Sequence, residues 1–136
     1  MKLAFSTLGC PDFNWEDIYS MAKDFGFDGV EMRGLGDEIF SVNAKPFCAV
    51  NLQRTIETLR KKHLEICCLS SGCALRFADQ EEENVAQLRR YIDLAHQLGT
   101  PFIRVLGDLT AQPNGDVDDE VVLHALSQLI PYSEEN

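Results

Sequence analysis

Short apolar segments alternate with longer amphipathic ones along the whole chain, and this alternation constrains the fold more than any other feature. The near-continuous apolar character of the short segments is typical of strands that are covered on both faces. Those predicted strands cover residues 2–8, 29–33, 65–71 and 102–106. The spacing of apolar residues between them predicts helices at residues 15–25, 51–63, 79–98 and from about 117 onward.

Capping residues mark where the predicted helices begin and end. Asn14 begins the first helix, and Asp17 supplies the second half of a capping box. Asp79 is the expected cap of the third helix. Gly26 and Gly99 follow the first and third helices, where a left-handed residue commonly ends a helix. The element order is therefore β-α-β-α-β-α-β-α.

Strands that are joined by helices run parallel and are connected by right-handed crossovers. Two α/β architectures fit this order: an open doubly wound sheet, or part of a (β/α)8 barrel. A dinucleotide site or a flavodoxin-like binding domain needs a phosphate-binding loop after a strand. Gly34-Leu35-Gly36 follows a predicted strand but does not lead directly into a helix, so the sequence argues against both.

The chain is strongly acidic, with 12 Lys and Arg residues against 22 Asp and Glu residues among 136, and a formal charge of −10. This charge argues against a nucleic-acid partner, because contacts to phosphates dominate that affinity. The sequence has no apolar run long enough to cross a membrane, and residues 1–6 do not resemble a signal peptide. The five cysteines include no C-x-x-C motif, so we expect reduced thiols and a cytoplasmic protein.

Three segments carry a family resemblance: KLAFSTLGCPDFNWEDI at 2–18, FGFDGVEMRG at 25–34 and LAHQLGTPFIRVLGD at 94–108. They resemble the first half of the xylose isomerase-like TIM barrels, which are sugar phosphate isomerases and epimerases related to ketose 3-epimerases and endonuclease IV. The resemblance implies that residues 1–136 form a (βα)4 half of a TIM (β/α)8 barrel, with parallel strands and the helices outside. Such barrels have roughly 250 residues, so we expect this chain to stop before a fifth strand.

The same resemblance implies a divalent metal, Mn, Mg, Co or Zn, for the full-length family. The family's ligands, two Glu, one Asp and one His, come from strands of the second half. No metal ligand or catalytic residue is therefore assigned in this sequence, no cofactor is predicted for this chain, and we expect the chain alone to be inactive.

Active sites of such barrels lie at the carboxyl ends of the strands. The polar residues there are the substrate-binding candidates: Ser6, Thr7, Glu31, Arg33, Ser70, Ser71 and Asp108. Simpler interpretations stay open for most of them. In these interpretations, the hydroxyls of Ser6 and Thr7 only bond to local backbone, Ser70 and Ser71 only start a turn, and Asp108 is only a solvated loop residue.

Alternation along the strands also predicts an ion pair. Val30 and Met32 should face the helices, which turns Glu31 and Arg33 toward the barrel interior. Arg104 lies between two apolar residues of the fourth strand and should turn inward as well. We therefore expect Glu31 and Arg104 to approach each other, because a buried charge needs a partner. Either this pair only organises the barrel floor, or Glu31 or Arg33 contacts the substrate.

The histidines His63, His96 and His124 fall on predicted helices or helix ends, so we interpret them as surface or packing residues. The acidic run 116–120 lacks the spacing of a calcium loop.

Three functions stay open at this point. The first is a fragment of a metal-dependent sugar or sugar phosphate isomerase or epimerase. The second is a non-enzymatic half-barrel that associates with a second copy through open strand edges. The third, which the charge disfavours, is DNA repair of the endonuclease IV type. We expect no nucleic-acid partner and no membrane partner.

Overall fold

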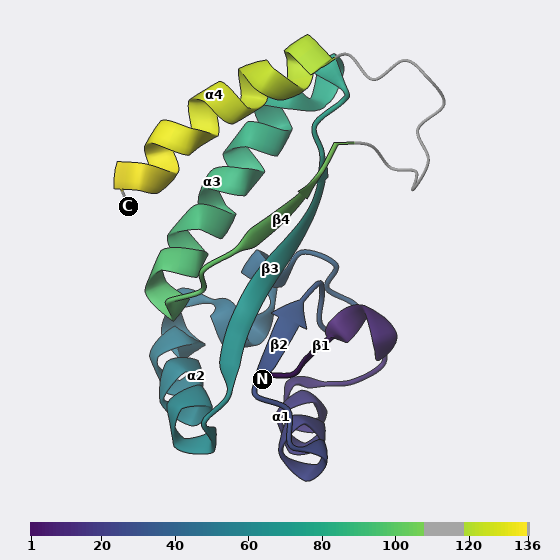
Figure 1. Ribbon diagram of the computed structural model, residues 1–136, viewed down its shortest axis with the longest axis vertical. Coiled ribbons are helices and arrows are strands. Elements are labelled where there is room, and N and C mark those ends of the chain that lie inside the picture. Colours follow the sequence, from purple (N-terminus) through teal and green to yellow (C-terminus); the bar gives the residue numbers. More distant parts are fainter. Residues whose placement is uncertain (108–118, 136) are drawn as a thin grey trace.

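A computed structural model describes residues 1–107 and 119–135 and shows one parallel sheet (Figure 1). Its strands are β1 (Ala4–Ser6), β2 (Gly29–Met32), β3 (Glu65–Ala74) and β4 (Ile103–Leu106). The spatial order is β1-β2-β3-β4, so each strand pairs in parallel with the next one in sequence. A doubly wound sheet reverses its strand order, whereas a barrel adds each strand beside the previous one. The predicted half-barrel is confirmed.

The helices are α1 (Trp15–Phe25), α2 (Ala49–Lys62), α3 (Glu81–Leu98) and α4 (Asp119–Glu135). The first three bury apolar side chains against one face of the sheet, where Ile18, Leu52 and Tyr91 share a core with Val30 and Leu69. Helix α4 packs on α3 and closes a second, smaller core (Figure 1). Within the described ranges, no helix is both long and apolar enough to cross a membrane.

A capping residue explains where α1 begins, whereas α3 begins without one. Asn14 Oδ1 accepts hydrogen bonds from the backbone N–H groups of Glu16, at 2.8 Å, and Asp17, at 3.1 Å, and Asp17 completes the capping box. The expectation for Asp79 was wrong: it lies in a 3-10 turn, and α3 begins at Glu81 without a side-chain cap. Instead, the negative charges of three consecutive glutamates in its first turn stabilise α3 by interacting with the positive end of the helix dipole.

Strand β3 is longer than the sequence predicts. The expected end was Ser71, yet the strand continues to Ala74. Gly72 has φ +73, and the register with β4 shifts between Ser70 and Ala74. This irregularity lets the chain remain paired with β4, and it places Ser70 and Ser71 inside the strand rather than at a turn.

Candidate functional site

The sheet has an open face opposite the helices, and its polar side chains are set by alternation along the strands. Val30 and Met32 of β2 are buried in the core with the helices. Glu31 lies between them and therefore points to the open face. Ile103 and Val105 of β4 pack against the helix cores. Arg104, between them, points to the same open face as Glu31.

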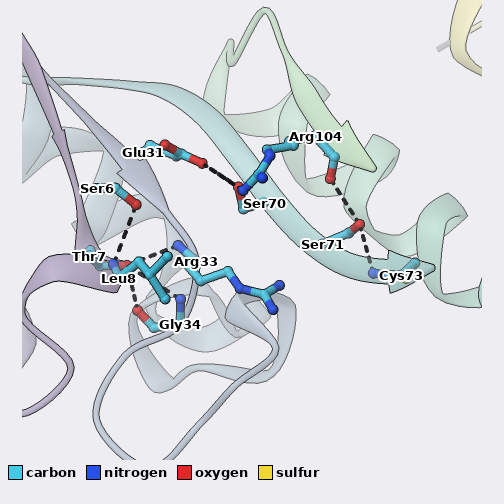
Figure 2. Close-up of polar contacts among 10 residues, drawn as sticks. All are labelled: Ser6, Thr7, Leu8, Glu31, Arg33, Gly34, Ser70, Ser71, Cys73 and Arg104. Carbon is cyan, nitrogen blue, oxygen red and sulfur yellow. Dashed lines mark hydrogen bonds and ion pairs between the residues drawn. The ribbon is translucent and has the colours of Figure 1, made fainter. Parts of the chain in front are cut away.

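Glu31, Ser70 and Arg104 meet on this face and are named the Glu31 cluster here (Figure 2). Ser70 Oγ donates a hydrogen bond to Glu31 Oε1. Arg104 Nη1 lies 4.0 Å from the same oxygen. The Glu31 side chain is 29% exposed and that of Arg104 is 55% exposed. The cluster thus presents a carboxylate oriented by a hydroxyl and a cation, with lone pairs left for the hydroxyl groups of a ligand.

Ser71 serves the sheet itself. It is fully buried, and its Oγ donates to the carbonyl oxygen of Arg104 at 3.0 Å. The same Oγ accepts a hydrogen bond from the Cys73 N–H at 3.2 Å. These bonds join β3 to β4 beside the shifted register, so the Ser71 hydroxyl is occupied by backbone groups.

Thr7 and Ser6 also bond to backbone. Thr7 is buried, donates to the Gly34 carbonyl at 3.0 Å and accepts from the Arg33 N–H at 2.9 Å. Ser6 Oγ accepts from the Leu8 N–H at 3.3 Å and caps the 3-10 turn Thr7–Gly9. The hydroxyl of Thr7 therefore ties the end of β1 to the end of β2.

Arg33 does not join the Glu31 cluster. Its guanidinium extends along β3 toward the Ser71–Cys73 segment, away from Glu31 (Figure 2). It lies against Gly72, where an added Cβ would be 2.2 Å from Arg33 Nη1. The remaining candidate, Asp108, lies outside the described residues.

Two cysteines near the cluster were not expected from the sequence. Cys67 and Cys68 are half-buried. A register shift between Val30 and Glu31 pairs Glu31 with Cys68. Burial raises the pKa of both thiols, and the negative charge of Glu31 raises it further, so they are poor nucleophiles at neutral pH. The sequence pattern marked them as part of an apolar strand, and no sequence signal predicts the shifted register.

The residues that the structure describes do not fit a resident divalent metal. Across residues 1–107 and 119–135, no three His, Cys, Asp or Glu side chains gather closely enough to hold an ion. His124 on α4 contacts Glu81 at the start of α3, on the outer helical layer. His63 follows α2, with a φ of 53°, and His96 lies in the last turn of α3.

The family model described as "Xylose isomerase-like TIM barrel" matches residues 19–136. Among solved structures, the chain is similar to the probable 3-DHS dehydratase AsbF involved in petrobactin synthesis from Bacillus anthracis. The TM-score is 0.73 at 19% identity, over 98% of this chain and 49% of that chain. It is also similar to the 3-keto-D-glucoside 4-epimerase YcjR from E. coli, with a TM-score of 0.71 at 17% identity, over 99% of this chain and 52% of that one.

A third similar structure is a xylose isomerase-like TIM barrel protein from Mycobacterium smegmatis in complex with magnesium. Its TM-score is 0.69 at 16% identity, over 98% of this chain and 52% of that chain. No curated protein sequence matches the chain. The chain thus spans about half the length of these solved structures. At such identities, the likeness shows the fold.

Proposed function

Because the chain belongs to the xylose isomerase-like TIM barrel family, we propose that it supplies the N-terminal half of a metal-dependent sugar or sugar phosphate isomerase or epimerase. The observation that carries the proposal is the Glu31 cluster on the open face of the sheet. In a complete barrel this face is the interior, and active sites of such barrels form at the carboxyl ends of the strands. One of the similar solved structures is a 3-keto-D-glucoside 4-epimerase, which supports this class of chemistry.

In this proposal the Glu31 cluster binds and orients the substrate. Ser70 and Arg104 hold the Glu31 carboxylate, and its remaining lone pairs accept hydrogen bonds from sugar hydroxyl groups. The described residues offer no metal ligand set. We therefore place the metal ligands and the acid–base groups outside them and expect the chain alone to bind sugar weakly without converting it.

An NMR titration of the ¹⁵N-labelled chain with D-xylose tests the binding role. We expect saturable shifts of the Cys68, Ser70 and Arg104 amide signals, and weaker binding in Glu31→Gln. The matched control is Glu57→Gln, which makes the same change at an exposed residue of α2. Equal binding by wild type and Glu31→Gln, or no saturable shift in the wild type, would contradict the proposal.

A second candidate function, a half-barrel that associates with another copy, is favoured by the edges of the sheet. Within the described residues, β1 pairs only with β2, and β4 pairs only with β3. Exposed apolar residues precede both edge strands: Leu3 is 53% exposed and Phe102 is 69% exposed. Unpaired strand edges favour pairing with another chain. A twofold arrangement that sets β4 beside the partner's β1 would satisfy both edges.

Sedimentation velocity at micromolar concentration tests this second candidate. We expect a dimer for the wild type and a shift toward monomer for Phe102→Lys, because lysine at a strand edge opposes pairing. Phe25→Lys is the matched control, since Phe25 on α1 is 77% exposed and lies outside the sheet. A wild-type chain that stays monomeric would rule out self-association as its function.

A further inference from the structure

Arg33 directly follows β2, and among the residues that the structure describes no carboxylate forms an ion pair with it. We propose that Arg33 is an anion-binding residue, so that the substrate of this site carries an oxyanion group, a carboxylate or a phosphate. This inference rests on the proposed function above and names the substrate class of that same site.

The backbone of Arg33 is fixed in place. It directly follows β2, and its N–H donates to the Oγ of buried Thr7 at 2.9 Å. Thr7 in turn donates to the carbonyl of the next residue, Gly34, at 3.0 Å. The start of the Arg33 side chain is therefore held between the carboxyl ends of β1 and β2, where barrel enzymes bind their substrates.

The guanidinium lies against Gly72 of β3. A Cβ added at Gly72 would lie 2.2 Å from Arg33 Nη1 and 3.0 Å from Cζ. Gly72 has φ +73, a conformation that other residues adopt only with strain. A side chain at this position would strain the backbone and displace the flexible end of Arg33. The Arg33 guanidinium thus occupies the space that a side chain at residue 72 would take.

The charge arrangement indicates that a ligand anion completes this position. Among the residues described in the structure, no carboxylate forms an ion pair with Arg33, whereas Arg104 lies 4.0 Å from Glu31. Acidic residues are abundant, since Asp and Glu outnumber Lys and Arg by 22 to 12. Arg33 is a partly buried residue, and a guanidinium without a carboxylate partner is a favourable site for an oxyanion, which its planar fork binds through two parallel hydrogen bonds.

The test is an NMR titration of the 136-residue chain with inorganic phosphate and, separately, with acetate. The readouts are the Arg33 Nε–Hε signal and the Gly72 amide signal. We expect saturable shifts of both with at least one anion, weaker binding in Arg33→Lys, and loss in Arg33→Met. Arg60→Met, on an exposed residue of α2, is the control for the change in net charge. Thermal unfolding of each variant shows whether it is folded. If Arg33→Met does not fold, the comparison of Arg33→Lys with the wild type still tests the inference.

The outcomes separate the two anion classes and the two proposals. Tighter binding of phosphate assigns a phosphate ester to the substrate, and tighter binding of acetate assigns a carboxylate. No saturable shift with either anion, or shifts that persist unchanged in Arg33→Met and Arg33→Lys, would overturn the inference. The D-xylose titration measures sugar binding at the Glu31 cluster, not anion binding at Arg33. Its failure would remove the proposed function, whereas anion binding at Arg33 would stand as a separate observation.

Discussion

Buried hydroxyl groups join neighbouring strands at the carboxyl end of this sheet. Thr7 connects β1 to the residues after β2, and Ser71 connects β3 to the backbone of β4. Because these hydroxyls are used by the backbone, the charged groups beside them are held at fixed positions on the open face. Polar residues at strand ends therefore divide into those that build the face and those that are displayed on it.

Thr7→Val should destabilise the chain by about 1–3 kcal/mol, because it leaves partly buried N–H and C=O groups of residues 33 and 34 without their partner. Thr7→Ser keeps the hydroxyl and serves as the control, with a smaller loss. Urea unfolding followed by circular dichroism measures both. Equal stability of Thr7→Val and wild type would show that these hydrogen bonds do not hold the two strands together.

The Glu31–Arg104 pair should contribute little to stability. The Arg104 side chain is 55% exposed, so solvent screens the 4.0 Å pair. A double-mutant cycle with Glu31→Gln and Arg104→Met should give a coupling free energy below about 1 kcal/mol in urea unfolding. A coupling above about 2 kcal/mol would mean that the pair is closed off from solvent, as in a completed barrel.

Burial raises the pKa of the Cys67 and Cys68 thiols, with a further increase from the charge of Glu31. Alkylation by iodoacetamide should therefore reach half of its maximal rate at a higher pH in the native chain than in urea. Because the native pKa is the higher one, the protonated thiols contribute stability that is fully present below the unfolded pKa and is lost as the pH rises through the native pKa. Mass spectrometry of the alkylated peptides measures the midpoints, and a native midpoint at or below the unfolded one would contradict the assignment.

At the scale of elements, the helix ends show what local chemistry determines. Asn14 and Asp17 bond to each other's backbone within four residues, so the start of α1 is readable from the sequence. Asp79 has a suitable type and spacing but sits in a 3-10 turn, because the helix begins two residues later. A capping residue in the sequence therefore predicts that a helix begins nearby, but it does not fix the first residue of that helix to better than about one turn.

Asn14→Ala should lower the free energy of unfolding by about 1 kcal/mol, because two N–H groups of α1 lose their acceptor. Asp79→Ala should have almost no effect, since Asp79 is exposed and caps no helix. Thermal unfolding of the two variants side by side gives the comparison. A larger loss for Asp79→Ala than for Asn14→Ala would reverse this account of the helix starts.

The last residues of strand β3, after Ser71, are not predicted by the sequence pattern. Residues 65–71 read as a strand, but Gly72-Cys73-Ala74 read as a loop because they contain a glycine and lack β-branched residues. Pairing with β4 extends the strand, and the Leu75 N–H donates to the Leu106 carbonyl at 2.8 Å. Alternation placed Glu31 and Arg104 on one face, whereas the contacts of Ser70 and Cys68 with Glu31 depend on register shifts that only tertiary pairing produces.

At the scale of the whole molecule, the sheet is one half of a barrel with one covered and one open face (Figure 1). The helices bury the apolar side chains of the covered face, and the open face carries the Glu31 cluster. The chain spans about half the length of the solved structures that it resembles. We propose that this half binds the substrate and that the groups which perform the chemistry lie outside the described residues.

The most direct test is a turnover assay of the 136-residue chain with Mg²⁺, Mn²⁺, Co²⁺ or Zn²⁺ and a panel of aldoses and ketoses in D₂O. Exchange of the C–H beside the carbonyl, followed by ¹H NMR, reports isomerase or epimerase chemistry. We predict no exchange above the EDTA control for any metal and sugar. Metal-dependent exchange by the chain alone would contradict the claim, most clearly if Glu31→Gln abolished it and Glu57→Gln did not.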